Sequence, residues 1–489
     1  MLWDLCGQDS EEFTLSATDP LPNAHHPCRL TIFAFLWASQ AVEHQEFFAG
    51  SLRVNSFSGW TLTILAMATL LWPGSLPLFT GMLAISVVNN VSFWPHVSNH
   101  ILLESIINVT ILLAIARTYA FRRTTEVSTR EAIFHRFDSV IRAMLVLLYY
   151  FAFISKLNEG FLDPDVSCVA TMYRNLSSKL AFLPDGSWTP VMTIWLTLFV
   201  EAAIPILLTF RRTRSFAIFL GLPFHYLLGM VGHRTFSAEI YALYGLFCME
   251  SLVYWVAGAQ RFIQERVTKQ RRHLFPKLVR VAVLAYSVLV ITELTLKSAP
   301  VSRAAQAAWA LWSLALAVVY VWAIVSSRAS RADSSDLSGR PGPGMLWLMF
   351  VVILLNGSTQ YLGLKTQTNF TMYSNLRTEG GVNNHLFMPA LHPFSYQDDL
   401  VDVLESDLPA LQKYVDDDLW ITHFEFQRIV SETTRDFQVK YRRGDEERRF
   451  QLRQGVNTDP ALYRKHPLWQ AKLLYFRPVD KAENPRCQH

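Results

Sequence analysis

The chain has 489 residues, of which 51% are hydrophobic, 13% aromatic and only 17% charged. Soluble proteins carry roughly 25% charged residues, so this composition excludes an ordinary soluble domain and favours a multi-pass membrane protein. The formal net charge is only +4, and the sequence contains no phosphate-binding loop or nucleic-acid motif, so nucleic acid is not an expected partner.

Apolar stretches that approach the roughly 20 residues of a spanning helix recur along the chain. We expect spans at residues 30–49, 58–73, 76–93, 101–118, 138–157, 187–209, 215–232, 236–258, 276–296, 304–326 and 344–361. The second and third stretches are short and are joined by Pro73 and Gly74. They are either tilted helices or a re-entrant pair, so the expected number of transmembrane helices is nine to eleven.

Arginine and lysine residues are concentrated in four links, which follow residues 118, 209, 258 and 326. Pairs of spans separate these links, so all four lie on one side of the membrane, and the positive-inside rule identifies that side as the cytoplasm. Residues 362–489 follow an outward span and are therefore expected outside the cytoplasm. We expect a bacterial inner membrane or a plasma membrane rather than the endoplasmic reticulum.

The predicted fold class is an all-α polytopic membrane bundle with a small extracytoplasmic α+β C-terminal domain. The expected parts are a polar cytoplasmic segment 1–28, a transmembrane domain 29–260, additional transmembrane helices 261–361 with a Ser/Gly/Pro-rich cytoplasmic linker 326–344, and the C-terminal domain 362–489. In the last part, "YQDDLVDVLESDLPALQKYVDDDLW" predicts a solvated helix. Alternating apolar residues in 437–452, interrupted by Gly444 and Asp445, predict a β-hairpin.

Ionisable residues inside spans are costly and indicate function by default. "YYFAFISKLNEGF" closes an apolar run with Lys156, which is followed by Asn158 and Glu159. Lys156 is either an anchor that reaches the membrane surface or a partly desolvated base. Anchoring lysines favour the cytoplasmic side, whereas this one is expected on the outer side. In "VSNHILLES", Asn99 is expected to cap a helix, and His100 is either an interfacial histidine or a site residue.

The stretch "LPFHYLLGMVGHRTFSAEIY" supplies three further candidates. His225 is expected about 12 Å inside the outer surface, whereas His233 and Arg234 lie at that surface. His225 is either a packing residue or a catalyst, and Glu239 can pair with Arg234. His100, Lys156 and His233 come from separate spans that the topology places on the same outer side, and together they suggest a proton-abstraction site.

Several other polar residues fit either a site or contacts between helices, namely Glu43, His44, Glu46 and Glu201. The five cysteines are Cys6, Cys28, Cys168, Cys248 and Cys487. They show no metal-binding or redox spacing, so no metal is expected. Cys28 or Cys487 could pair with Cys168 in an oxidising compartment, but we expect free thiols.

The segment "YYFAFISKLNEGFLDPD" resembles the pattern Y-F-x-A-G-x-x-K-L-x-x-x-W of the vitamin K-dependent gamma-carboxylases and their bacterial relatives, the horizontally transferred transmembrane (HTTM) proteins. "SNHILL" and "FHYLLGM…HRTFSAEIYALYGLF" resemble two further motifs of that family, and the similarity covers roughly residues 25–260. Ser155 stands where the carboxylases have the first of two adjacent lysines. The block "NGSTQYLGLKTQTNFTMYSNLRTEGGVNNHLFMP" (356–389) resembles one found in bacterial HTTM-like proteins, and we expect an ordered, hydrogen-bonded loop near the outer face.

The resemblance implies a lyase-type HTTM enzyme with a reduced quinone, either vitamin K hydroquinone or menaquinol, as cofactor. The implied site residues are Lys156 as base, His100 and His225 as assisting groups, and Asn99, His233 and Arg234 as quinone-binding or substrate-binding residues. The implied partners are membrane lipids and a small-molecule or protein substrate on the outer side. Two alternatives remain: a non-catalytic protein that binds lipid or acts as a scaffold for its C-terminal domain, and a transporter, for which no inverted repeat is visible.

Overall fold

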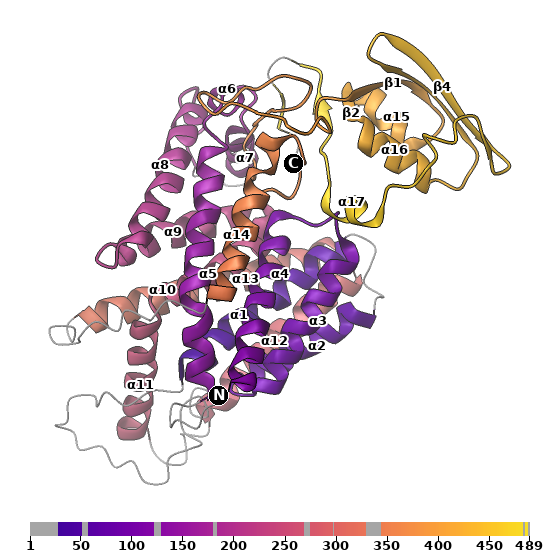
Figure 1. The fold of residues 1–489 in the computed structure, drawn as a ribbon. Helices are drawn as coiled ribbons and strands as arrows, with labels where there is room; N and C mark the ends of the chain where they lie inside the picture. The colour runs from indigo at the N-terminus through magenta and orange to yellow at the C-terminus, as the bar shows by residue number, and fades with distance from the viewer. Residues whose placement is uncertain are drawn as a thin grey trace. The chain divides into compact units, whose positions relative to one another are not determined.

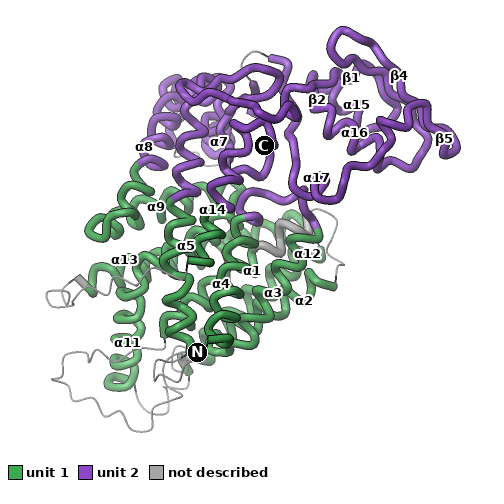
Figure 2. The backbone as a smooth tube through the Cα atoms, in the orientation of Figure 1, with its two compact units in different colours: residues 1–92, 103–146, 203–351 green, residues 93–102, 147–202, 352–489 purple. Residues whose placement is uncertain are grey.

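The computed structural model describes residues 28–50, 57–121, 129–178, 183–267, 274–296, 298–328, 344–482 and 485–487. The chain divides into two compact units (Figure 2). Unit 1 comprises residues 1–92, 103–146 and 203–351, and unit 2 comprises 93–102, 147–202 and 352–489. Most of the predicted N-terminal segment and most of the predicted cytoplasmic linker lie outside the described residues.

Helices form most of the described chain up to residue 362 (Figure 1). In chain order they are α1 (Cys28–Gly50), α2 (Phe57–Leu71), α3 (Leu76–Phe93), α4 (Asn99–Ala120), α5 (Thr129–Ile154), α6 (Glu159–Leu162), α7 (Cys168–Ser177), α8 (Thr189–Thr209), α9 (Arg214–Leu228), the π-helix η1 (Gly229–His233), α10 (Arg234–Phe247), α11 (Met249–Arg266), α12 (Leu274–Leu296), α13 (Ala299–Arg328), α14 (Gly344–Ser358) and the 3-10 helix η3 (Thr359–Leu362). Among the described residues, seven helical stretches are long and apolar enough to cross a membrane. This fits the expected multi-pass membrane protein, although fewer stretches meet the criterion than the nine to eleven spans expected.

The boundary between the expected spans 215–232 and 236–258 agrees with the observed helices, but the end of the second span does not. Gly232 has a φ of +109°, which interrupts the helical backbone between α9 and α10 where a boundary was expected. The second span, however, ends at Phe247, and α11 begins directly after Cys248. Hydropathy could not detect this break, because the residues on both sides of Cys248 are apolar.

Close contact between helices builds the core of unit 1. Helix α1 packs against α10 in an antiparallel arrangement, because Glu43 contacts Arg234 whereas Leu36 lies beside Gly245. A Cβ atom added to Gly245 would lie 2.6 Å from Leu36 Cδ1, so a larger residue here would force the Leu36 side chain to shift. The Tyr320 hydroxyl of α13 donates to the Tyr241 carbonyl of α10 at 2.6 Å and links a third helix to this core.

The C-terminal part of unit 2 contains a six-stranded antiparallel sheet in the order β5-β4-β3-β1-β2-β6. In chain order, the strands and helices of this C-terminal part are β1 (Leu400–Ser406), α15 (Pro409–Asp416), β2 (Leu419–Thr422), α16 (His423–Glu432), β3 (Phe437–Arg443), β4 (Glu446–Arg453), β5 (Val456–Asn457), α17 (Leu468–Leu473) and β6 (Val479–Asp480). The predicted hairpin is confirmed: β3 pairs with β4, and Gly444 adopts a φ of +58° in the turn. Buried Val439 and Phe450 of the hairpin belong to the same core as Phe426 and Val430 of α16.

The prediction of one solvated helix before this hairpin was wrong in part. Only Pro409–Asp416 is helical, and it lies between strands β1 and β2. In β1, buried Val401 and Val403 alternate with the more exposed Asp402. This period of two buries one face of a strand, and the acidic residues of the segment obscured it in the sequence.

The expectation of free thiols was also wrong for Cys28, Cys168 and Cys487, which are disulfide-bonded. Cys168 at the start of α7 and Cys487 near the C-terminus form a disulfide across 319 residues of sequence. Sequence spacing does not reveal such a pairing, because the folding of the C-terminal domain brings Cys487 to α7. Cys248 is a buried free thiol.

Candidate functional site

The turn that follows α5 holds Lys156 inside unit 2. Helix α5 ends at Ile154, and the Lys156 side chain folds back so that Nζ donates to the Ala152 carbonyl at 3.1 Å. The carbonyl groups at a helix C-terminus lack intrahelical partners and carry partial negative charge, so they favour an ammonium group. Only 5% of the Lys156 side chain is exposed, so the protein encloses the ammonium instead of presenting it at its surface.

Glu201 on α8 supplies the carboxylate that faces Lys156. Its Oε2 atom lies 2.9 Å from Lys156 Nζ, and only 10% of the Glu201 side chain is exposed. The acidic neighbour in the sequence, Glu159, is exposed. The sequence could not separate a site role for Glu201 from a contact between helices, because its partner Lys156 lies in the turn after α5 and not on α8.

Apolar side chains surround this ion pair. The Phe161 ring centroid lies 5.9 Å from Lys156 Nζ, and Phe161 forms a buried cluster with Ile194 and Leu198. Such surroundings exclude water and lower the local dielectric constant, which strengthens the attraction between the two charges. The same surroundings penalise either charge if its partner is removed.

A loop from the C-terminal half of the chain lies along the Lys156 turn. His385 Nε2 contacts the Ile154 carbonyl at 2.9 Å, and the Leu386 amide donates to the Leu157 carbonyl at 3.0 Å. The Glu159 amide in turn donates to the carbonyl of Asn384 at 3.1 Å. Residues 384–386 thus satisfy backbone groups on both sides of Lys156 and fix the position of the turn.

Asn158 connects this turn to the same loop system through its side chain. Its Nδ2 donates to the Ser155 carbonyl at 2.7 Å and to the Ser374 carbonyl at 2.6 Å, and its Oδ1 accepts from the Phe161 amide at 2.8 Å. The hydrogen bonding predicted for block 356–389 is therefore confirmed, and these contacts hold the turn that carries Lys156. Four non-glycine residues of this block have positive φ angles: Thr368, Phe370, Tyr373 and Asn375.

Asn99 also forms a hydrogen bond with block 356–389. Its Oδ1 accepts from the Phe370 amide at 2.7 Å, and Thr368 Oγ1 donates to the Val97 carbonyl at 2.7 Å. Asn99 is the first residue of α4, and its side chain orders the loop instead of capping the helix as expected. The ring nitrogens of His100 lie 3.1 and 3.2 Å from Ser98 Oγ.

The other three predicted site residues belong to unit 1 (Figure 2). His225 is buried, and its ring lies 5.4 Å from the Phe236 ring, measured between centroids. His233 follows the backbone break at Gly232. The sequence suggests Glu239 as an ion-pair partner of Arg234. In the structure, the Arg234 guanidinium instead lies 3.4 Å from the Glu43 carboxylate and 2.5 Å from that of Glu293. These acids come from α1 and α12, so sequence proximity to Arg234 was misleading.

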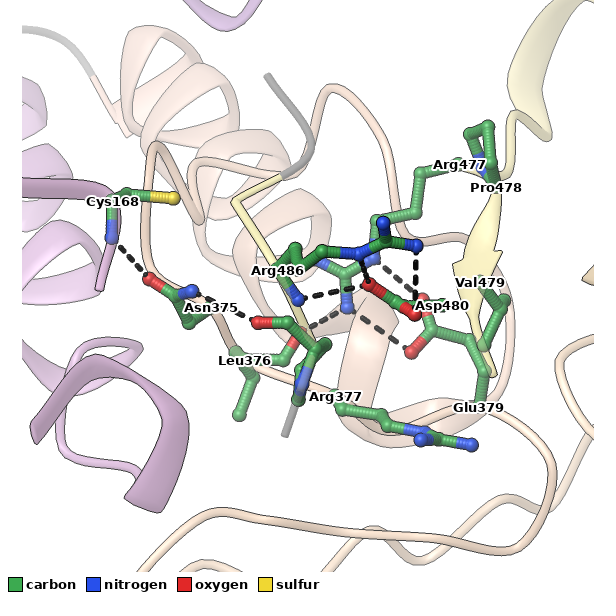
Figure 3. A pocket seen from close by; sticks show the side chains of 11 residues that line it. Cys168, Asn375, Leu376, Arg377, Glu379, Arg477, Pro478, Val479, Asp480 and Arg486 are labelled. Atoms are coloured by element: carbon green, nitrogen blue, oxygen red, sulfur yellow. Dashed lines mark hydrogen bonds and ion pairs between the residues drawn. The ribbon is translucent and has the colours of Figure 1, made fainter. Parts of the chain in front are cut away.

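A small pocket near the disulfide in unit 2 is lined by paired charges (Figure 3). Arg477 donates to both carboxylate oxygens of Glu379, at 2.8 and 3.0 Å, and Arg486 donates to Asp480 at 2.8 Å. Burial alone would raise the pKa of Glu379, but the Arg477 guanidinium and the Thr378 amide hold it below its ordinary value. The Glu379–Arg477 ion pair therefore joins block 356–389 to the C-terminal segment, and we call this pair the clasp.

We predict that Asn158→Asp loosens the Lys156 turn. The substitution keeps the acceptor for the Phe161 amide but removes the donor to the Ser155 and Ser374 carbonyls. Loss of a buried hydrogen-bond donor costs about 1–3 kcal/mol. Amide hydrogen exchange should become faster in 154–161 and 374–386. The matched control is Asn175→Asp, because Asn175 is exposed and lies outside both segments, and faster exchange in both variants would contradict the assigned role of Asn158.

We also predict that the Glu379–Arg477 clasp weakens in acid. The folded state lowers the pKa of Glu379, so its stabilising contribution is complete above the ordinary value of 4.5 and is lost as pH falls below it. The thermal transition of the wild type should therefore decrease between pH 7 and pH 4 by more than that of Glu379→Gln. The control is Glu405→Gln, because Glu405 is exposed. The thermal transition of this variant should decrease between pH 7 and pH 4 by as much as that of the wild type. An equal decrease in the wild type and Glu379→Gln would refute the clasp.

Comparison with known proteins adds no relative to this description of the site. No family model, no curated protein and no solved structure matches the chain. The chemistry must therefore be inferred from the side chains themselves, foremost from Lys156 and Glu201.

Proposed function

We propose that the chain is an integral membrane enzyme that removes a proton from a reduced quinone at the outer membrane face. The buried contact between Lys156 and Glu201 carries this proposal. The resemblance to the vitamin K-dependent gamma-carboxylases supports it, because that resemblance assigns Lys156 the role of base. Carboxylation of a small-molecule or protein substrate on the outer side belongs to the same proposal.

The pair offers Lys156 a route to its basic form. When one proton moves from the Lys156 ammonium to the Glu201 carboxylate, two charged groups become a neutral amine and a neutral carboxylic acid. This exchange removes both buried charges at once, so it leaves neither group as an unpaired ion. The amine lone pair on Lys156 Nζ can then accept a proton from a substrate hydroxyl, and Glu201 afterwards stabilises the ammonium again.

The residues around Lys156 fit a quinol. Phe161, Ile194 and Leu198 provide apolar walls, and Lys156 with Glu201 provides polar groups at one end of them. A reduced quinone would supply an acidic hydroxyl group there. Because Lys156 is almost fully buried, entry of a substrate requires displacement of neighbouring side chains.

The same burial favours a second candidate, a non-catalytic membrane protein that binds lipid or serves as a scaffold. In this alternative, the Lys156 ammonium only closes the C-terminus of α5 through Ala152 and neutralises Glu201. The two candidates make opposite demands on residue 156. A structural role requires a positive charge, whereas a base must also be able to lose its proton.

An extracytoplasmic location of residues 362–489 is part of this proposal. The arginine-rich links support it, and the disulfide between Cys168 and Cys487 supports it independently. Both cysteines lie in segments expected outside the cytoplasm, and disulfides persist mainly in oxidising compartments. The substrate would then reach the site from the outer side.

We predict that Lys156→Ala and Lys156→Arg both lose activity by about 100-fold or more, because loss of a general base has effects of this size and arginine stays protonated. The assay incubates purified protein with vitamin K hydroquinone or menaquinol and oxygen and measures the quinone epoxide. Glu201→Gln should also reduce epoxide formation. Glu159→Gln is the matched control with an exposed acid and should retain activity.

The outcome of this assay separates the two candidates. Full activity in Lys156→Arg would contradict the base and leave the structural role. Absence of epoxide with the wild type and both quinols would contradict the proposed cofactor. Thermal transitions of all variants, recorded alongside, separate loss of folding from loss of chemistry.

We predict that Asp445→Cys, in the turn of the β3–β4 hairpin, reacts with an impermeant maleimide on intact cells. The expected outer location of the C-terminal domain is the reason. Exposed Arg212, changed to Cys, is the control for the cytoplasmic side and should react only after permeabilisation. Protection of Asp445→Cys until permeabilisation would overturn the topology.

A further inference from the structure

A loop of unit 2 presents a run of apolar side chains at the protein surface. We call residues 386–394 the apolar loop. Its large apolar side chains are about half exposed or more, namely Leu386 (51%), Phe387 (62%), Leu391 (73%) and Phe394 (47%). The surrounding stretch 380–397 contains no Asp, Glu, Lys or Arg. An apolar surface without charges of its own indicates a site that another apolar surface covers.

Hydrogen bonds attach the apolar loop to the C-terminal ends of two long apolar helices. The Leu386 amide donates to the carbonyl of Leu157, which closely follows α5, at 3.0 Å. The Leu391 amide donates at 2.9 Å to the carbonyl of Tyr361 in η3, the 3-10 helix that continues α14. Both helices belong to stretches that are long and apolar enough to cross a membrane. The apolar loop therefore lies where both stretches end.

The length of α14 and η3 gives the level of the apolar loop relative to a bilayer. At about 1.5 Å per residue in the α-helix and about 2.0 Å in the 3-10 helix, Gly344–Leu362 is about 30 Å long. The hydrocarbon core has the same thickness, and a headgroup layer of about 5–7 Å covers each side of it. Val352, Leu354 and Leu355 of α14 are exposed, as lipid-facing side chains would be. A loop bonded to the end of this stretch lies in the headgroup layer.

The backbone of the apolar loop fits surroundings that contain little water. Pro389 and Pro393 carry no amide hydrogen. The other amides that donate to partners in unit 2 are those of Leu386, Phe387, Met388, Leu391, His392 and Phe394. Among the described residues, only the Ala390 amide of this loop has no such acceptor. Peptide groups without partners are costly in a bilayer, so this pattern suits insertion.

We propose that the apolar loop inserts into the boundary between headgroups and acyl chains of the membrane that α14 crosses, and that its partner is phospholipid. Leucine and phenylalanine side chains are typical of segments that bind at this boundary. A protein partner or a second copy of the chain could cover an apolar surface too, but at this level it would have to displace the headgroups. The inference rests on the proposed membrane location and is independent of the chemistry proposed for Lys156.

The test measures contact between the loop and lipid by fluorescence quenching. Full-length Leu391→Cys and Phe387→Cys are labelled with bimane without reductant, and the wild type, treated in the same way, gives the background from Cys248. Each protein is placed in nanodiscs of phosphatidylcholine, either unmodified or brominated on the acyl carbons nearest the headgroup. Bromine quenches only fluorophores that it contacts, so both variants should lose fluorescence in the brominated lipid. Zwitterionic lipid should suffice, because the loop contains no Asp, Glu, Lys or Arg.

Two control positions separate failure of this proposal from failure of the membrane location. Val456→Cys on β5 is the matched control, because Val456 is also 73% exposed, and it should keep its fluorescence. Leu355→Cys on α14 should be quenched if that helix lies in lipid. Quenching at Leu355 without quenching at Leu391 and Phe387 would overturn the loop proposal and leave the membrane location intact. Absence of quenching at all positions would overturn both.

A water-soluble quencher identifies any other occupant of the loop. A label at Leu391 that neither brominated lipid nor iodide quenches would indicate a protein contact and overturn the proposal. Equal quenching of Val456→Cys and Leu391→Cys by brominated lipid would also overturn it, because the contact would then not be specific to the loop. Thermal transitions that match the wild type show that the cysteine variants are folded.

Discussion

Every charge that this chain removes from water needs a partner inside the protein, and this constraint organises both units. Lys156 meets Glu201, Arg234 is shared by Glu43 and Glu293, and Glu379 meets Arg477. Each partner comes from a different element of the fold, so each pair also fixes the position of one element against another. The energetic reason is that burial removes the solvation of an ion, which only a close opposite charge or hydrogen bonds can replace.

Backbone groups obey the same constraint in block 356–389. This segment has little regular secondary structure, yet many of its residues are buried. Asparagine side chains satisfy the exposed peptide groups: Asn99 accepts from Phe370, Asn158 donates to Ser374, and Asn375 accepts from the Cys168 amide. Asparagine suits these positions, because one side-chain amide can both donate and accept hydrogen bonds. The turn that carries Lys156 depends on this network for its position.

The two carboxyl environments of unit 1 and the ion pair of unit 2 illustrate three outcomes for a buried acid. Glu201 faces an ammonium, Glu104 accepts hydrogen bonds from neutral groups, and Glu239 has neither. The first arrangement places two opposite charges in contact, the second supplies hydrogen-bond donors to both carboxylate oxygens, and the third leaves both oxygens without a hydrogen bond among the described residues.

The sequence by itself determined the long apolar helices, the β3–β4 hairpin and the hydrogen-bonded block 356–389, because hydropathy, two-residue alternation and turn residues are local signals. It also identified Lys156 and Arg234 as ionisable residues that needed an explanation. Only the tertiary structure decided their partners, since Glu201 and Glu43 reach them from other helices. The disulfide from Cys168 to Cys487 and the strand β1 needed the fold for the same reason: contacts between distant segments leave no periodic trace in one sequence.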